Sequence, residues 1–168
     1  SGTGSPMYYA ARIAKEKYPD AKIVFVGPCV AKRKEAQRDE AVDFVMTFEE
    51  VSSIFDAFEV NLEIVQPYAM EFSSVREAHG FAQAGGVMGA VKAFLKMEAD
   101  KINAIQVSDL NKKNIGTLRA YAKSGKAPGQ FIEVMACEGG CITGPSTHSG
   151  SNGKRQLVQE LAKQEKTY

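Results

Sequence analysis

Apolar residues along the chain form two kinds of pattern, which predict helices alternating with short strands. Apolar positions with near-helical spacing predict helices over residues 6–18, 47–58, 81–97, 111–124 and 152–166. Short apolar runs predict strands over residues 22–27, 42–46, 103–107 and 130–135. The first of these runs is almost continuously apolar, which is typical of a strand buried on both faces. Residues 61–74 contain Pro67 and no clear period, which indicates a long loop or an edge feature.

Residues at the ends of the predicted helices support these boundaries. Ser5 before Pro6 combines a good N-cap with a proline at the first helical position. Thr47 followed by Glu50 forms a capping box. Gly125 is a typical residue for a helix C-terminus. The Gly85-Gly86 pair near the start of the third helix indicates close packing of the backbone there.

The alternation of strands with helices predicts an α/β fold with a parallel four-stranded sheet flanked by helices. Parallel neighbours need long crossover connections, and the predicted helices supply them. The length of 168 residues favours one domain over residues 1–168. Cys29 follows the first strand, and Cys137 and Cys141 follow the last. Because ligands gather at the carboxyl ends of strands in open α/β sheets, we expect these cysteines at one edge.

Charge and hydropathy exclude several classes of function. The chain carries 21 Lys+Arg and 20 Asp+Glu, so its net charge of +1 gives no argument for nucleic acid or an anionic membrane surface. No stretch approaches the roughly 20 apolar residues that span a bilayer, and the N-terminus lacks a signal-peptide pattern. We therefore expect a cytoplasmic protein.

The three cysteines are the candidate functional residues of the chain. They form no Cys-x-x-Cys pair, and their odd number argues against a disulfide framework. Cys137 and Cys141 flank Gly139-Gly140, and thiolates are the natural ligands of iron-sulfur clusters. Glycine permits close approach, so backbone N–H groups of the loop are expected to face cluster sulfur. A zinc site would need a fourth ligand from His79 or His148, which lie in separate segments, so we favour iron-sulfur over zinc.

Two spaced motifs resemble a known family. Pro28-Cys29-x-x-Lys32-x-x-Glu35 and Glu133-x-Met135-Ala136-Cys137-x-Gly139-Gly140-Cys141 resemble the second and third signature motifs of the iron-only ([FeFe]) hydrogenase large subunit. Supporting similarity, in family order, runs through Ser5-Pro6, Glu35-Ala36-Gln37-Arg38, Val42-Asp43 and Ala84-Gly85-Gly86-Val87-Met88. The resemblance implies the C-terminal lobe of a two-lobed catalytic domain.

The resemblance also implies roles for individual residues. Cys29, Cys137 and Cys141 would ligate a [4Fe-4S] cluster, and Cys141 would bridge it to an attached two-iron unit, the assembly called the H-cluster. Met135 would pack beside the cluster. Lys32 would place its ammonium near a cyanide ligand, and Glu35 would hold Lys32 by an ion pair or take part in proton transfer. Taken alone, Lys32 and Glu35 are equally an ordinary surface i,i+3 pair.

The chain departs from the family pattern in three places. The first signature motif, with the fourth cubane ligand and the proton-passing cysteine, is missing, so the isolated piece is expected to be inactive. Gly27 stands where catalytic members have methionine, and Gly144-Pro145-Ser146-Thr147 replaces the usual glycine run. These changes resemble the divergent, sensory-type hydrogenase-like group.

Three functions remain open at this point. The first is a fragment of a protein that interconverts protons, electrons and dihydrogen, or senses hydrogen, with an upstream lobe and iron-sulfur electron-transfer domains as partners. The second is a non-catalytic iron-sulfur binding or assembly-type protein, and the third is a doubly wound binding domain with incidental cysteines. Lys32 favours the first, because a plain cubane has no cyanide to bind. An apolar face left by the absent lobe would suit a homodimer of the fragment.

Overall fold

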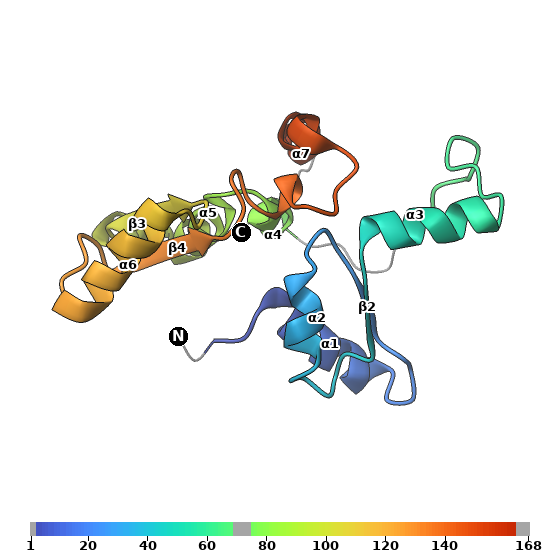
Figure 1. The fold of residues 1–168 in the computed structure, drawn as a ribbon, viewed down its shortest axis with the longest axis horizontal. Helices are drawn as coiled ribbons and strands as arrows, with labels where there is room; N and C mark the ends of the chain where they lie inside the picture. The colour runs from blue at the N-terminus through green and yellow to red at the C-terminus, as the bar shows by residue number, and fades with distance from the viewer. Residues whose placement is uncertain (1–2, 69–74, 164–168) are drawn as a thin grey trace. The chain divides into compact units, whose positions relative to one another are not determined.

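Two parallel strand pairs, each closed by one crossover helix, form the centre of the fold. In the first, β1 (Val24–Val26) continues through α2 (Ala31–Ala36) into β2 (Phe44–Met46). In the second, β3 (Ala104–Ser108) continues through α6 (Lys112–Ser124) into β4 (Phe131–Met135). The computed structural model describes residues 3–68 and 75–163, and it divides into two units (Figure 1). The predicted α/β character is confirmed.

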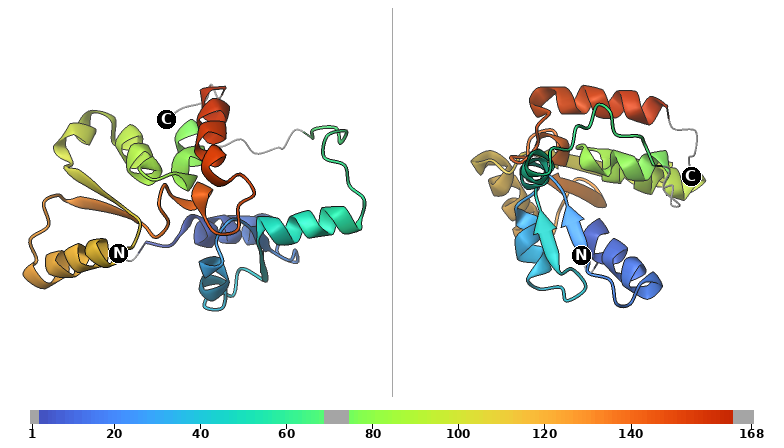
Figure 2. Two further views of the ribbon diagram at one scale, coloured as in Figure 1. Left: turned by 45° about the horizontal axis from the view of Figure 1, so that its top comes forward. Right: turned by 90° about the vertical axis from the view of Figure 1, so that its right-hand side faces the viewer.

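The first unit comprises the chain up to residue 67 together with residues 145–148. Its core forms where α1 (Pro6–Lys17) contributes Met7 and Ala11, which pack with Val42 and the partly buried Phe25. Ser5 caps α1, because its hydroxyl accepts a hydrogen bond from the N–H of Tyr8 at 3.2 Å. The neighbouring β1 and β2 are visible side by side in Figure 2.

The helix α3 (Phe48–Ala57) begins at the predicted capping box. The Thr47 hydroxyl accepts from the N–H of Glu50 at 3.2 Å, and the Glu50 carboxylate accepts from the N–H of Thr47 at 2.8 Å. This reciprocal pair satisfies two N–H groups that the first turn of a helix leaves without partners. The start of the helix is therefore fixed by its own sequence.

The prediction that the first strand is buried on both faces is wrong. Val24 and Val26 are 46% and 42% exposed, whereas Phe25 between them packs on the core. Side chains of a strand alternate between its faces, and only the face that carries Phe25 is covered by α1. An apolar run shows that a strand is hydrophobic, but it does not show what covers the second face.

The second unit comprises residues 68–144 and 149 to the end. Besides β3, α6 and β4 it contains α4 (Arg76–His79), α5 (Gly86–Leu95), α7 (Gly153–Ala162) and four short 3-10 turns, namely Gly80–Ala82, Lys96–Lys101, Cys141–Thr143 and Gly150–Asn152. The predicted helix over 81–97 is therefore shorter than expected. Gly85 adopts φ 89° and breaks the helical path before α5 begins.

The predicted close packing at Gly85-Gly86 is confirmed. A Cβ at Gly86 would lie 1.8 Å from the carbonyl oxygen of Gly80, so only glycine fits. This contact lets the turn over 80–82 lie directly against the first turn of α5.

A single four-stranded sheet is not what the described residues form. Their strands make two two-stranded sheets, with Val24 opposite Phe44 in one and Ala104 opposite Phe131 in the other. Each pair is closed by its own local crossover helix, which is a short-range arrangement that sequence patterns capture well. Pairing between the two sheets would depend on contacts distant in sequence, on which the apolar runs carry no information.

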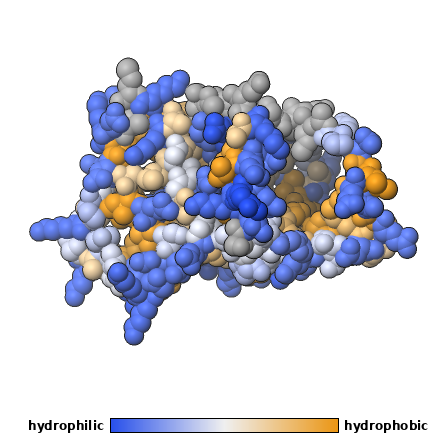
Figure 3. Space-filling view, turned by 90° about the horizontal axis from the view of Figure 1, so that it is seen from above, coloured by the Kyte–Doolittle hydropathy of each residue, from blue (hydrophilic) through white to orange (hydrophobic). Residues whose placement is uncertain are grey.

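Some predictions fall partly outside the described residues. The predicted loop over 61–74 includes residues 69–74, and the end of the predicted last helix includes residues 164–166. In the described part, α7 begins at Gly153, one residue after the predicted start, and ends at Ala162 with Lys163 as its C-cap, before the predicted end. Within the described ranges, no helix is both long and apolar enough to cross a bilayer. Figure 3 shows hydrophobic residues reaching the surface. Among the described residues, Phe58, Ile64 and Tyr68 are among the most exposed large apolar or aromatic side chains.

Candidate functional site

The loop that follows β4 carries two of the three cysteines. Strand β4 ends at Met135, and Cys137 follows two residues later, as predicted. Cys141 opens the 3-10 turn that runs to Thr143. Both thiols are free of disulfides and partly buried. The segment from Cys137 to Cys141, called the cysteine loop below, thus presents two thiols within one turn of chain.

The turn at the end of β3 forms hydrogen bonds with the residues that lead into the cysteine loop. The N–H of Asp109 donates to the carbonyl of Met135 at 3.0 Å, and the N–H of Leu110 donates to that of Ala136 at 3.1 Å. The Ser108 hydroxyl accepts from the N–H of Gly139 at 3.0 Å. These bonds prolong the contact between β3 and β4 beyond the strands.

The two glycines give the cysteine loop its path. Gly139 and Gly140 adopt φ 79° and 101°, in the region that favours glycine. A Cβ at Gly140 would lie 2.5 Å from the backbone N of Ala84 and 2.7 Å from the carbonyl oxygen of Ala82. The N–H of Ala84 donates to the carbonyl of Gly139 at 3.0 Å. The glycines therefore let the loop lie directly against residues 82–84.

The N–H groups of the two glycines are not open toward a cluster, although the sequence predicted open N–H groups in this loop. The N–H of Gly139 is taken by Ser108, and the N–H of Gly140 donates to the carbonyl of Cys137 at 3.1 Å. Among the residues that the structure describes, the N–H groups of Cys137 and Glu138 donate to no acceptor. The N–H groups of the first cysteine and its neighbour are thus open donors of the loop, whereas both glycine N–H groups are used to build the turn.

Thr143 closes the loop behind the second thiol. Its hydroxyl lies within hydrogen-bonding distance of the carbonyls of Glu138 and Gly140. The N–H of Gly144 donates to the carbonyl of Cys141 at 2.9 Å. The carbonyls of Glu138, Gly140 and Cys141 therefore all accept hydrogen bonds from residues 143 and 144.

Glu133 anchors β4 to the start of α5. Glu133 is 4% exposed, and its carboxylate accepts from the N–H of Gly85 at 2.6 Å and from that of Met88 at 2.7 Å. A carboxylate at a helix N-terminus satisfies donors that the helix leaves open, and the helix dipole favours it there. The first residue of the third motif therefore has a structural role in the second unit.

Cys29, Lys32 and Glu35 lie together in the first unit. Cys29 falls between β1 and α2, as predicted, and its carbonyl accepts from the N–H of Lys32 at 3.2 Å. The thiol is partly buried and forms no disulfide. Lys32 and Glu35 form the predicted i,i+3 ion pair, with Nζ and Oε2 separated by 2.5 Å. One of the three donors of the ammonium group is thus engaged by Glu35.

Glu35 is held by a second donor. Its other carboxylate oxygen accepts a hydrogen bond from the Ser5 hydroxyl, the N-cap of α1. Partial burial opposes ionisation of Glu35, but the hydrogen bonds from Lys32 and Ser5 outweigh it, so the pKa of Glu35 is lowered. The side chain is therefore a fixed anion that orients Lys32.

Gly27 precedes Cys29 and has no open space around it. A Cβ at this position would lie 2.7 Å from the Phe25 ring. Since residues 25 and 27 share one face of the strand, the ring occupies the volume that a larger residue 27 would need. The Phe25 ring therefore takes up the space beside Gly27 that a side chain at this position would need.

The histidines are not drawn into a metal site. His79 ends α4 in the second unit, His148 belongs to the first unit, and both are exposed. In the described ranges no group of three or more His, Cys, Asp or Glu side chains is arranged to hold a metal ion. The structure shows two thiols in one unit and one thiol in the other.

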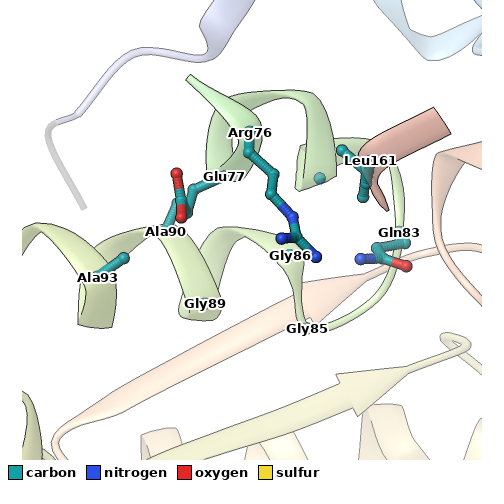
Figure 4. A pocket seen from close by; sticks show the side chains of 10 residues that line it. Arg76, Glu77, Gln83, Gly85, Gly86, Gly89, Ala90, Ala93 and Leu161 are labelled. Carbon is teal, nitrogen blue, oxygen red and sulfur yellow. The ribbon is translucent and has the colours of Figure 1, made fainter. Parts of the chain in front are cut away.

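A pocket of about 320 Å³ in the second unit is lined by no cysteine. Figure 4 shows the side chains of Arg76 and Gln83 pointing into it beside the Gly-rich start of α5. Glu77 also lines the pocket, and its Oε2 atom is buried without a hydrogen-bond partner among the described residues. None of the residues predicted for the site lines this pocket.

Sequence reasoning missed two residues that shape the cysteine loop and the anchoring role of a third, Glu133, at the start of α5. Ser108 and Thr143 act through single hydroxyl groups, for which the sequence carries no recognisable signal. Glu133 was part of the third motif, and its place three residues before Ala136 in an otherwise apolar strand was a signal of a buried partner.

Comparison with known families gives a consistent picture. The model of the family described as iron only hydrogenase large subunit, C-terminal domain, matches residues 1–145. The chain is 28% identical to the cytosolic Fe-S cluster assembly factor narfl of Danio rerio, over 84% of the chain and 46% of the relative. It is also 28% identical to iron hydrogenase 1 of Clostridium pasteurianum, over 86% of the chain and 33% of the relative. The chain therefore spans less than half the length of these relatives.

A solved [FeFe]-hydrogenase structure, described for oxygen inactivation of the H cluster, has the same fold. The TM-score is 0.66 at 20% sequence identity, covering 100% of this chain and 61% of that one. At this identity the likeness concerns the fold alone.

Proposed function

The chain belongs to the family of iron-only hydrogenase large subunits, C-terminal domain, and on this basis we propose that Cys29, Cys137 and Cys141 ligate an iron-sulfur cluster. The observation that carries the proposal is the cysteine loop. Two thiols that form no disulfide flank glycines that keep the loop narrow, and within the described residues no acceptor takes the N–H groups of Cys137 and Glu138. Hydrogen bonds of this kind tune the potential of a cluster.

The donor set fits an iron-sulfur cluster better than zinc. Thiolates bind zinc as well as iron-sulfur clusters, but neither exposed histidine lies in the cysteine loop, and the match to the iron-only hydrogenase family favours the cluster. Three cysteines leave a [4Fe-4S] cubane one ligand short, so we infer that a part of the whole protein beyond these residues supplies the fourth. When bound, such a cluster supplies one-electron redox chemistry.

We propose that Lys32 and Glu35 serve an attached two-iron unit in the whole protein. Glu35 is fixed by Lys32 and Ser5, so it holds the ammonium group in one position. The remaining donors of Lys32 suit an anionic ligand such as cyanide, because an ammonium group offers three rotatable N–H donors. Met135, at the end of β4, is placed by the same strand that delivers Cys137. In this reading the whole protein acts on dihydrogen and protons in the cytoplasm.

Packing at Gly27 favours a sensory role over fast turnover. The Phe25 ring lies 2.7 Å from the place of a Cβ at residue 27, and we infer that the surroundings of Cys29 differ from those of family members with methionine there. A changed side chain near a metal retunes its potential. We expect slow hydrogen turnover by the whole, cluster-loaded protein, and turnover as fast as that of catalytic members would refute the sensory role.

A second candidate is a non-catalytic iron-sulfur assembly-type function. It is favoured by the similarity to the assembly factor of Danio rerio, at the same identity as to the Clostridium hydrogenase. The two candidates differ in the two-iron unit. Infrared bands of cyanide ligands in the matured whole protein support the first, and a cluster without such bands supports the second.

The direct test of ligation is anaerobic reconstitution of this chain and of the whole protein. We expect iron and acid-labile sulfide to bind with a cluster signal in electron paramagnetic resonance, more stably in the whole protein. Replacing Cys29, Cys137 or Cys141 by serine, one at a time, is expected to abolish the stable signal.

A matched control replaces both histidines by alanine. The His79→Ala, His148→Ala variant is expected to keep the iron, because neither side chain is a ligand in this proposal. Iron that survives the serine variants, or that depends on the histidines, would contradict the proposed ligand set.

A further inference from the structure

Ser108 joins the end of β3 to the cysteine loop through one hydroxyl group. The hydroxyl accepts from the N–H of Gly139 at 3.0 Å and lies 3.5 Å from the carbonyl of Cys137, to which it donates. Cys137 and Gly139 bracket the stretch that carries the first thiol. A single side chain therefore fixes both ends of that stretch.

The turn that carries Ser108 is itself held in place. The side-chain amide of Asn114 donates to the carbonyl of Ser108 at 3.2 Å and to that of Asp109 at 2.7 Å. Asp109 adopts φ 74°, a left-handed conformation that aspartate tolerates better than most residues. Its carboxylate also accepts from the side chain of Asn111 at 2.9 Å. Ser108 thus acts from a rigid base.

The same hydroxyl decides which backbone donors of the loop stay open. The hydroxyl takes the N–H of Gly139, and the carbonyl of Cys137 takes that of Gly140, whereas the N–H groups of Cys137 and Glu138 donate to no acceptor within the described residues. Without the hydroxyl, the N–H of Gly139 would lose its partner and the stretch from Cys137 to Gly139 would lose both of its anchors to β3.

We propose that Ser108 is a positioning residue for the Cys137 thiol: it anchors the stretch that carries this thiol and withholds the Gly139 donor. The proposal rests on the proposed function, in which Cys137 is a cluster ligand. It is nevertheless a statement about the chain without any cluster, and it can be tested there.

The first test is thiol alkylation of the metal-free chain with iodoacetamide, read at each cysteine by fragment-ion mass spectrometry. In Ser108→Ala we expect the rate at Cys137 relative to that at Cys29 to rise by about fivefold or more, as loss of the anchoring bonds favours an open loop. Ser108→Thr keeps the hydroxyl and is expected to restore most of the original ratio.

The control is Ser53→Ala, which removes a hydroxyl that bonds within the exposed helix α3 and should leave the ratio unchanged. An unchanged ratio in Ser108→Ala, or a threonine variant that behaves like the alanine variant, would overturn the proposal. A general loosening of the unit would raise the rates of Ser108→Ala and Ser108→Thr alike.

The second test needs no substitution and so survives a variant that does not fold. In hydrogen exchange of the unsubstituted chain, the Gly139 amide is expected to exchange more slowly than the Glu138 amide, since only the first has an acceptor. Equal rates would overturn the proposal. Failure of iron binding would refute the proposed function but would leave both of these results standing.

Discussion

Replacing Gly140 by alanine tests the cysteine loop most directly. Gly140 adopts φ 101° and ψ −170°, a combination that is essentially restricted to glycine and costs other residues about 1–3 kcal/mol. The new Cβ would also lie 2.5–2.7 Å from backbone atoms of residues 82–84, and relief of such overpacking costs about 1–3 kcal/mol more. The expected loss in the free energy of unfolding is therefore about 2–6 kcal/mol.

Gly125→Ala is the matched control in the same unit. Gly125 has φ 65° at the end of α6, but a Cβ there would meet no atom within 4 Å. The loss in free energy of unfolding of Gly125→Ala therefore measures the cost of a left-handed conformation alone, about 1–2 kcal/mol. The difference between the two variants measures the close approach of the loop to residues 82–84.

The assay is urea denaturation followed by far-ultraviolet circular dichroism, because the chain contains no tryptophan. The midpoint of Gly140→Ala is expected well below that of Gly125→Ala, with a similar slope. Cluster binding by Gly140→Ala should also fall, since Cys141 is the next residue. Equal midpoints for the two variants would refute the close approach on which the loop geometry depends.

Three further perturbations test other parts of the structure. Glu133→Gln replaces one of two carboxylate acceptors by an amide donor that faces an N–H. We therefore expect the free energy of unfolding, measured by urea denaturation, to fall by about 2–3 kcal/mol, and to change little in the control Glu138→Gln at an exposed residue. Similar losses in both variants would contradict the capping role of Glu133. The Asp43 pKa is lowered to about 2, chiefly by hydrogen bonds from the Lys22 side chain and the backbone of Ile23. A carboxyl whose pKa is lower in the folded than in the unfolded state stabilises the folded state at pH values above the unfolded pKa. For Asp43 this stabilisation is lost as the pH falls from about 4 to about 2. The stability of Asp43→Asn should therefore depend less on pH in that window, as measured by acid denaturation. Glu77→Met removes a buried carboxylate oxygen without a partner and is expected to raise the free energy of unfolding by about 1 kcal/mol, whereas a loss would show that this oxygen is satisfied in solution.

Local features of the fold were predictable from the sequence. The cap at Ser5, the capping box at Thr47 and the end of α6 at Gly125 each depend on residues within one helical turn, and all three are confirmed. The four strands were found because short apolar runs are a local signal. The positions of Cys29 and Cys137 after strand ends followed from these assignments.

Features that depend on distant contacts were not predictable. The split into two strand pairs and the exposure of Val24 reflect which surfaces meet, and an apolar run has no information about its partner. The break at Gly85 arises because its φ of 89° lets the turn over 80–82 pack on α5. The anchors at Ser108 likewise join positions about thirty residues apart, so the pattern around either position alone could not reveal them.

The local closure of each strand pair has a consequence for the order in which the chain matures. A strand pair joined by a single short crossover forms from contacts close in sequence, and such contacts form early while the rest of the chain is still being synthesised. We therefore expect the strand pair around Cys29 to form before Cys137 and Cys141 have been translated, whereas residues 145–148 of the same unit join it later. A cluster held by all three thiols can be inserted only after synthesis of the second pair is complete, and until then the Cys29 thiol depends on a reducing environment for protection.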